Sequence, residues 1–225
     1  MKTIMITGAG SGLGRELALS FSDKGFHLLL AGRNIEKLSA VEKEIESSGG
    51  MANIISLDIQ NAQEVTKRAE EINKNFQIFG LINNAGVGHF GPFEELTEHQ
   101  ITEMLNTNVL GTILMTKEFL PHLLKAGEGR IINIISTAGL RGKVNEAVYV
   151  ASKFAIRGFT ESLQKEYENS GIQITAVYMG GMDTPFWSNS NHITDPTRFR
   201  SPREVAEIIL EQMDQGSIII ESKKS

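Results

Sequence analysis

The order of local patterns along the chain restricts its fold more than any other feature. Short apolar runs rich in β-forming residues alternate with longer segments whose apolar residues recur at helical spacing, which is typical of βαβ units around a parallel sheet. Two of the runs, "RIINIIS" and "IQITAVY", are almost continuously hydrophobic, as expected for strands that are covered on both faces. The strands are predicted at Thr3–Thr7, His27–Ala31, Asn53–Leu57, Gly80–Asn83, Arg130–Ile135, Ile172–Tyr178 and Ser217–Glu221.

Six segments of helical period separate or follow these strands. The last has the clearest start, because Ser201 can cap it, Pro202 takes the first helical position and Glu204 completes a capping box. We therefore expect an α/β fold, a single doubly wound domain over residues 1–225 with a seven-stranded parallel sheet flanked by helices and with ligands at the carboxyl ends of the strands. The helices are predicted at Gly12–Lys24, Ile35–Ser48, Ala62–Asn75, Glu98–Lys125, Ala147–Asn169 and Pro202–Gln215.

The composition excludes several classes of protein. A net charge of −5 and an isoelectric point near 5.6 give no basic surface for nucleic acid, and no run of about 18 apolar residues could span a membrane. The opening segment "MKTIMITGAG" lacks the apolar region and cleavage site of a signal peptide. The absence of cysteine rules out disulfides and cysteine–zinc sites and fits a cytoplasmic protein. The five histidines are scattered, so no metal site is expected.

The segment "IMITGAGSGLGREL" places Gly8, Gly12 and Gly14 between the first predicted strand and the first predicted helix. Glycines here permit a tight turn and let backbone N–H groups approach a pyrophosphate at the helix N-terminus. A nucleoside-triphosphate P-loop would need lysine and then serine or threonine after the last glycine, whereas Arg15 and Glu16 follow Gly14. The segment therefore indicates a dinucleotide site.

The glycine spacing resembles that of the short-chain dehydrogenase/reductase family, and further motifs follow in that family's order. The resemblance covers essentially the whole chain and implies a Rossmann-like domain that binds a nicotinamide cofactor. The further motifs are "NNAG" at Asn83–Gly86, "NVLG" at Asn108–Gly111, "IIS" ending at Ser136, then Tyr149 thirteen residues later and Lys153 four beyond it.

Tyr149 and Lys153 are four residues apart in a predicted helix, so their side chains share one helix face. A free phenol has a pKa of about 10 and exchanges protons poorly at neutral pH. A nearby ammonium group favours the phenolate, so Lys153 is expected to lower the pKa of Tyr149 toward the range that general acid–base catalysis requires. The alternative for such a pair is that the tyrosine ring packs internally and the lysine points into water.

The resemblance implies a role for each catalytic candidate. Tyr149 would exchange a proton with the carbonyl or alcohol oxygen of the substrate, and Ser136 would hydrogen-bond and position that oxygen. Lys153 would also hold the nicotinamide ribose, and Asn108 would anchor a water that links Lys153 to solvent. Asn106, in the same "NTNVLG" segment, competes for the last role. Alternatively, Ser136 caps the end of its strand and Asn108 bonds locally in its helix.

The end of the second predicted strand, "LLLAGRN", indicates which cofactor is bound. An acidic residue there would hold the adenosine ribose and repel a 2′-phosphate, whereas Arg33 can pair with phosphate. NADP(H) is therefore favoured over NAD(H), the alternative being that Arg33 is a solvated surface residue. Ser11 stands where some NADP-preferring relatives carry a second basic residue, and Asp58 resembles the family's adenine-contacting aspartate or instead caps a helix. The resemblance implies cofactor binding by Gly8, Ser11, Gly12, Leu13, Gly14, Arg33, Asp58, Asn84, Ala85, Gly86, Tyr149, Lys153, Met182 and Thr184.

On the substrate side, "YMGGMDTPFW" carries Met179 where the family usually has proline, whereas Gly180 and Thr184 match the family pattern. By the same resemblance, Met182 would offer its backbone to the nicotinamide carboxamide. The segment of about 181–200 is predicted to be a lid, and its aromatic residues favour a small, apolar ketone or diketone unless they pack on one another. The predicted substrate-binding residues are Ser136, Val144, Tyr149 and Phe186.

Together these features predict an NADP(H)-dependent carbonyl reductase. One alternative is an NAD(H)-dependent alcohol dehydrogenase. Another is a non-catalytic, NADP-binding redox-sensing regulator, a class that commonly lacks part of the Ser–Tyr–Lys set that this chain keeps. The expected partner is a small-molecule carbonyl or alcohol substrate, with no nucleic acid and no membrane, and the resemblance implies a homodimer or homotetramer.

Overall fold

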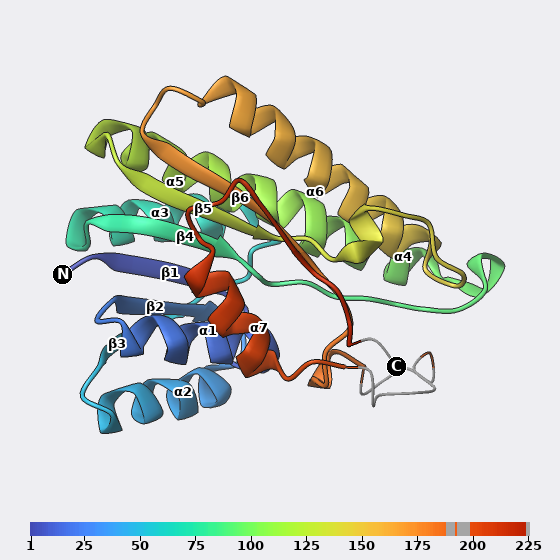
Figure 1. The fold of residues 1–225 in the computed structure, drawn as a ribbon, viewed down its shortest axis with the longest axis horizontal. Coiled ribbons are helices and arrows are strands. Elements are labelled where there is room, and N and C mark those ends of the chain that lie inside the picture. The colour runs from blue at the N-terminus through green and yellow to red at the C-terminus, as the bar shows by residue number, and fades with distance from the viewer. Residues whose placement is uncertain (188–191, 193–198, 224–225) are drawn as a thin grey trace.

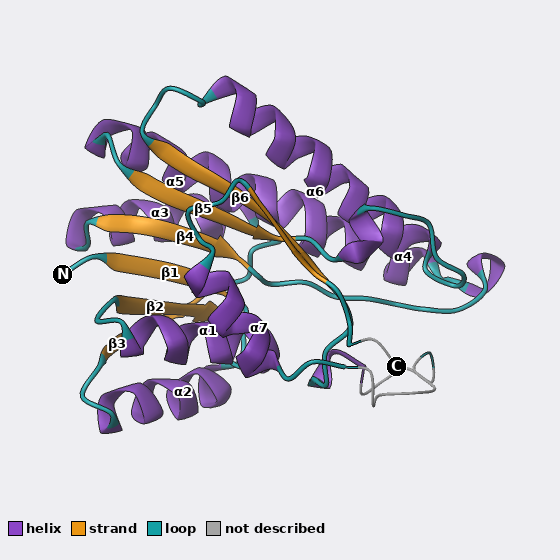
Figure 2. Cartoon of the chain, viewed as in Figure 1, coloured by secondary structure: helices purple, strands orange, loops and turns teal. Residues whose placement is uncertain are grey.

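A computed structural model describes residues 1–187, 192 and 199–223. Its centre is a sheet of seven parallel strands in the order β3-β2-β1-β4-β5-β6-β7 (Figure 2). All seven predicted strands are confirmed, with ends that differ from the prediction by at most two residues. The strands are β1 (Thr3–Thr7), β2 (His27–Gly32), β3 (Met51–Ser56), β4 (Ile78–Asn83), β5 (Gly129–Ile134), β6 (Ile172–Met179) and β7 (Ser217–Ile220).

Helices cover both faces of this sheet (Figure 1). They are α1 (Gly12–Asp23), α2 (Ile35–Ser47), α3 (Ala62–Asn75), α4 (Glu98–Leu105), α5 (Thr112–Ala126), α6 (Ala147–Glu166) and α7 (Pro202–Glu211), of which α6 and α7 end earlier than predicted. The helices α1, α2 and α7 pack on one face, α3, α5 and α6 pack on the other, and α4 lies against α6. In the part of the chain that the structure describes, no helix combines the length and apolarity needed to cross a bilayer.

The central strand β1 shows how one sheet supports two hydrophobic cores. Ile4 and Ile6 belong to the core beneath α1, α2 and α7, whereas Met5, between them, belongs to the opposite core with Leu81 and Phe119. Because side chains alternate between the faces of a sheet, a strand buried on both faces needs an apolar side chain at every position. This explains why the strands β5 and β6, which carry the runs "RIINIIS" and "IQITAVY", are almost continuously hydrophobic.

The prediction of one continuous helix over Glu98–Lys125 is wrong, because Asn106–Gly111 forms a π-helical turn between α4 and α5. Two tertiary contacts favour this wider turn. The Asn108 side chain accepts the backbone N–H of Val87 at 2.8 Å and donates to its carbonyl at 2.9 Å, and a Cβ at Gly111 would lie 2.7 Å from Ile59. Apolar spacing along the chain carries no sign of such contacts.

The turn between β1 and α1 depends on three glycines. Gly8 and Gly12 have φ angles of +66° and +53°, in the left-handed region that glycine adopts without strain. Gly14 packs so closely behind this turn that a Cβ on it would lie 2.2 Å from the carbonyl oxygen of Gly8. The third glycine therefore lets α1 begin directly beside the end of β1.

We expect Gly14→Ala to destabilise the protein by about 2–3 kcal/mol, because the backbone of Gly8 must move to admit the methyl group. The matched control is Gly158→Ala on the exposed side of α6, where a Cβ would meet nothing within 4 Å. This control should stabilise the protein by about 0.5–1 kcal/mol or leave it unchanged. Urea unfolding measures both variants, and equal stabilities would contradict the packing described for Gly14.

Candidate active site

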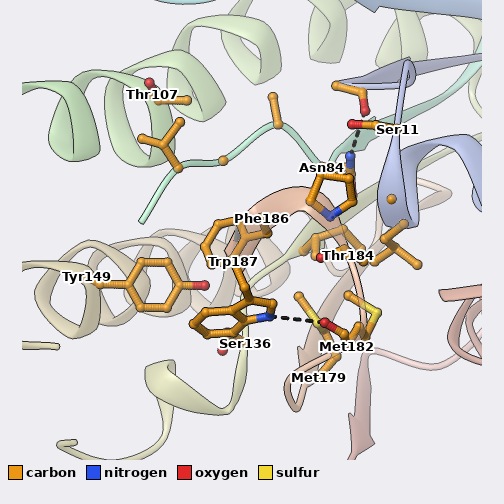
Figure 3. A pocket seen from close by; sticks show the side chains of 18 of the residues that line it. Ser11, Asn84, Thr107, Ser136, Tyr149, Met179, Met182, Thr184, Phe186 and Trp187 are labelled. Carbon is orange, nitrogen blue, oxygen red and sulfur yellow. Dashed lines mark hydrogen bonds between the residues drawn. The ribbon is translucent and has the colours of Figure 1, made fainter. Parts of the chain in front are cut away.

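The loops that follow the carboxyl ends of the strands enclose a cavity of about 680 Å³. The cavity opens where the strand order reverses, since β1 has β2 on one side and β4 on the other. Figure 3 shows residues from the ends of several strands facing one another across it. The predicted site residues that line it are Gly8, Ser11, Gly12, Leu13, Arg33, Asp58, Asn84, Ala85, Gly86, Ser136, Tyr149, Lys153, Met182, Thr184 and Phe186.

Three predicted site residues are not part of the lining. Gly14 supports the glycine turn from behind, and Asn108 is buried beneath the cavity. Val144 is 83% exposed and lies outside the lining, so its contact with substrate stays a prediction. The loop before α6 turns Val144 toward solvent and places Lys143 and Glu146 against the cavity instead.

Asn84, which follows β4, fastens the glycine turn to the neighbouring strand end. Its side-chain amide donates to the carbonyl oxygens of Thr7 at 3.0 Å and Gly8 at 3.3 Å. The Thr7 hydroxyl in turn accepts the backbone N–H groups of Asn84 and Ala85, both at 3.0 Å. With these groups fixed and no Cβ at Gly8 or Gly12, the start of α1 presents open backbone to the cavity, which fits a dinucleotide pyrophosphate.

Two cations border the cavity beyond the end of β2. Arg33 follows that strand and Lys37 lies in the first turn of α2, and both are exposed. Lys37 was not predicted as a site residue, although it follows Arg33 by four residues at the start of a predicted helix, a spacing that can place both cations at one site. Nearby, the Asp58 carboxylate accepts the backbone N–H of Gln60 at 3.0 Å, whereas Asn61 caps α3, so the alternative of Asp58 as a helix cap is wrong.

Tyr149 and Lys153 lie on the inner face of α6 and are 5% and 6% exposed. The Lys153 ammonium lies 5.6 Å from the centre of the Tyr149 ring and donates to the carbonyl oxygen of Ile134 at 3.1 Å, so the alternative of a solvated lysine is wrong. Ser136 follows β5 with a φ of 122°, a strained value for a residue with a side chain. Its hydroxyl accepts the Ala138 N–H at 3.2 Å, and both Ser136 and Tyr149 line the cavity.

Burial decides the protonation of this pair. It raises the pKa of Tyr149 above its ordinary value, the hydrogen bond with Ser136 lowers that pKa, and the carboxylate of Glu146 raises it further. The expected net lowering of this pKa is therefore wrong for the chain's own groups, because desolvation is the largest effect. Burial also lowers the pKa of Lys153 to about 8. At neutral pH the Tyr149 phenol is therefore protonated, and Lys153 is a cation that loses its proton at a pH of about 8.

Asn108 does not line the cavity but connects two of the segments that form its wall. Its amide group donates to the carbonyl of Val87 and to the hydroxyl of Ser152, at 2.9 and 3.0 Å, and Ser152 donates to the carbonyl of Tyr149 at 2.7 Å. These bonds join the loop after β4 to the first turns of α6, so the alternative that the side chain bonds locally is wrong. Asn106, the competing candidate, is half-buried and does not line the cavity.

Aromatic rings surround the side of the cavity into which the Tyr149 hydroxyl points (Figure 3). Phe90 and Phe186 lie 5.4 and 5.8 Å from the Tyr149 ring, and Trp187 stacks on Phe90 at 5.0 Å. The Trp187 indole donates to the carbonyl of Met182 at 3.0 Å. The Met182 carbonyl, one of the two backbone groups that could bind a nicotinamide carboxamide, therefore already accepts a hydrogen bond. Residues 188–191 and 193–198 of the predicted lid lie outside the described residues.

Two polar side chains of the lining were not identified from the sequence. Thr107, on the π turn, and Glu146, at the start of α6, are both buried. Within the described residues, the Thr107 hydroxyl and one Glu146 oxygen have no hydrogen-bond partner. A threonine and a glutamate at these places carry no sequence signal of burial. Among the same residues, no group of three or more histidine, aspartate or glutamate side chains could hold a metal ion.

Comparison with known proteins agrees with this geometry. The family model for short chain dehydrogenases matches residues 2–194. An uncharacterized oxidoreductase of Thermotoga maritima is 36% identical over 180 residues, which cover 80% of this chain and 71% of that protein. Sepiapterin reductase of Chlorobaculum tepidum is 32% identical over 192 residues, which cover 82% of this chain and 79% of that protein.

A solved structure extends the likeness over nearly the whole chain. The alcohol dehydrogenase from the archaeon Thermococcus sibiricus, complexed with 5-hydroxy-NADP, superimposes with a TM-score of 0.88 at 27% identity, covering 98% of this chain and 95% of that one. The chain therefore belongs to the short-chain dehydrogenase family and is an NAD(P)-dependent oxidoreductase.

Proposed function

We propose that this enzyme is an NADP(H)-dependent carbonyl reductase that acts on a small, mainly apolar ketone. The observation that carries the proposal is the Tyr149 side chain, which is buried in the wall of a cavity that Ser136 and Lys153 also line, with the Lys153 ammonium 5.6 Å from the centre of its ring. The hydroxyl is protonated at neutral pH and can donate to a carbonyl oxygen as negative charge develops there, while the nearby Lys153 ammonium offsets the cost of forming the phenolate.

Each of the buried polar groups has a task in such a reduction. Ser136 and Tyr149 hydrogen-bond the same carbonyl oxygen and polarise the carbonyl group. A reduced nicotinamide, when bound, supplies the hydride that the carbonyl carbon accepts. Tyr149 gives its proton to the oxygen, and the Lys153 ammonium stabilises the phenolate that remains. Because the pKa of Lys153 is lowered to about 8, this ammonium returns a proton toward the phenol more readily than an ordinary lysine.

The preference for NADP(H) rests on the two cations beyond β2. Arg33 and Lys37 are placed to pair with a 2′-phosphate on the adenosine ribose, and Ala31 and Gly32 leave the end of β2 without a carboxylate that would repel it. The start of α1 would hold the pyrophosphate, and Lys153 the ribose next to the nicotinamide. The Thermococcus sibiricus enzyme is complexed with an NADP derivative, which supports the same choice.

The substrate end of the cavity and one outer face support two further parts of the proposal. Phe186 and Trp187 supply an apolar wall that suits a compact ketone. Leu105, Leu110 and Phe154 expose about two fifths of their surface on the α4–α6 side, at 41%, 42% and 41%. We propose that residues 1–225 form one catalytic domain and that this side joins it to further copies in a homodimer or homotetramer.

Replacement of the phenol tests the proposed activity. Wild-type enzyme should oxidise NADPH, followed at 340 nm, when a panel of ketones and aldehydes is supplied. Tyr149→Phe should lower kcat/KM by at least about a thousandfold, because it removes the proton donor and keeps the ring. Tyr167→Phe, at the solvent-facing end of α6, is the matched control and should keep wild-type activity. Ketone-independent NADPH oxidation, or an active Tyr149→Phe variant, would contradict the proposal.

The cofactor preference is tested by removing the two cations. Arg33→Ala combined with Lys37→Ala should lower kcat/KM for NADPH by about 10- to 100-fold, since two charge-assisted contacts are lost, and should leave kcat/KM for NADH within about threefold. Lys43→Ala, on the exposed side of the same helix, serves as the control. An equal loss with both cofactors would mean that the cations do not recognise the 2′-phosphate.

The lowered pKa of Lys153 gives a prediction about stability. Because its folded-state pKa of about 8 lies below the unfolded value, burial of the charged form opposes folding below pH 8, and this effect disappears as the pH rises toward 10. Lys153→Met should therefore be more stable than wild type at pH 6–7 by about 1–3 kcal/mol, with a difference that shrinks above pH 8. Lys165→Met, exposed on the same helix, should show no such dependence. Urea unfolding at several pH values measures both, and a constant difference would contradict the burial effect.

A further inference from the structure

Glu146 carries a carboxylate that is buried in the cavity wall without all the partners that burial normally requires. The residue is 5% exposed, and its Oε2 makes no hydrogen bond within the described part of the chain. The Lys143 ammonium lies 3.8 Å from Oε2, beyond hydrogen-bond distance, while Oε1 is hydrogen-bonded to Nε2 of His192 at 3.0 Å. A buried carboxylate oxygen without a donor opposes folding, so its presence in the cavity points to a ligand.

Capping of α6 does not account for this side chain. Glu146 occupies the residue before the first turn of the helix, where an acidic side chain commonly accepts a backbone N–H group. Its side chain makes no such bond, and only its backbone carbonyl takes part, by accepting the N–H of Val150 at 2.7 Å. The carboxylate is thus directed away from the helix and lines the cavity.

The carboxylate also lies close to the reacting group. Glu146 precedes Tyr149 by three residues at the start of α6, and both residues line the cavity. The charge of Glu146 also raises the pKa of the Tyr149 hydroxyl. A ketone bound in this cavity therefore lies against a wall to which both side chains belong.

The charges around Glu146 decide what its free oxygen can bind. Lys143 and His192 already face the carboxylate from the preceding loop and from the region after Trp187. An added cation on the substrate would be repelled by Lys143, whereas a neutral hydroxyl donates a hydrogen bond without adding charge. The His192 ring stacks on Phe90 at 5.0 Å, so the apolar wall begins directly beside this polar point.

We propose that Glu146 is a specificity-determining residue and that the natural substrate is a ketone whose otherwise apolar body carries a hydroxyl group that donates to Oε2 of Glu146. This inference rests on the proposed reductase function and adds one polar anchor to it. The anchor selects strongly, because a substrate that lacks the hydroxyl leaves the carboxylate oxygen desolvated and unpaired.

Three matched pairs of ketones test the inference, each with a hydroxyl in one member and a methyl group in its place in the other. They are α-hydroxyacetophenone and propiophenone, β-hydroxypropiophenone and butyrophenone, and γ-hydroxybutyrophenone and valerophenone. The measurement is kcat/KM with NADPH for each compound, expressed as the ratio of the hydroxyketone to its alkyl partner. Differences in intrinsic reactivity cancel when this ratio is compared between variants.

For at least one pair, Glu146→Leu should lower the ratio by at least about tenfold while the alkyl ketone is still reduced. Glu146→Gln should retain part of the preference, because its amide oxygen can still accept a hydrogen bond. Glu161→Leu, which removes an exposed carboxylate paired with Arg157 on the same helix, is the control and should keep the wild-type ratio. If Glu146→Leu does not fold, a smaller but definite fall of the ratio in Glu146→Gln is required.

The outcomes separate this inference from the proposed function. An unchanged ratio for all three pairs, with alkyl ketones still reduced, overturns the role of Glu146 and leaves the reductase function in place. A Glu146-dependent preference of the wild type for α-aminoacetophenone over α-hydroxyacetophenone overturns the choice of a neutral donor. Failure to reduce any of the six ketones contradicts the proposed function, and the inference that rests on it falls as well.

Discussion

Thr7, the last residue of β1, joins the two strand ends between which the cavity opens. Its hydroxyl accepts two successive backbone N–H groups after β4, and the Asn84 amide returns hydrogen bonds to the carbonyl groups of Thr7 and Gly8. Parallel strands that are neighbours in space but distant in sequence would otherwise be free to splay at this edge. The reciprocal bonds hold the ends of β1 and β4 together at the point where the strand order reverses and the cavity opens. The glycine turn packs so closely there that Gly8 and Gly14 leave no room for a side chain.

The crevice then controls chemistry by excluding water. Tyr149, Lys153 and Glu146 are all buried, and burial favours the uncharged form of Tyr149 and of Lys153. For Tyr149 this keeps the proton in place, for Lys153 it brings the loss of charge near neutral pH, and for Glu146 it creates a demand for a donor. The proposed proton donation and the proposed substrate selection therefore have the same physical origin, since both depend on polar groups held in a desolvated wall.

Features set by local geometry were predictable from the sequence, whereas those set by distant contacts were not. The strands and the glycine turn follow from side-chain alternation and from φ angles that only glycine adopts freely. The π turn was missed because Asn108 is held by Val87, a partner 21 residues away that helical spacing does not reveal. The outward turn of Val144 and the inward turn of its near neighbour Glu146 depend on how one loop meets the sheet.

The direction of the Tyr149 pKa shift was predicted wrongly for a related reason. Sequence spacing gives the distance to Lys153, but it gives no measure of how much water the fold removes from the phenol, and desolvation is the larger effect. Lys37, by contrast, could have been predicted as a site residue from the sequence. It lies in the first turn of a predicted helix, four residues after Arg33.

The most direct test of this account is a titration of the tyrosinate absorbance near 295 nm in the protein alone, with the Tyr149→Phe spectrum subtracted from that of wild type. The subtraction removes the contributions of the other two tyrosines, Tyr167 and Tyr178. The account predicts no tyrosinate signal from Tyr149 at the pH of about 10 where an exposed tyrosine is half ionised. A signal that reaches half of its amplitude at or below that pH would show that burial does not raise the pKa of Tyr149, and it would contradict the desolvated wall on which this account depends.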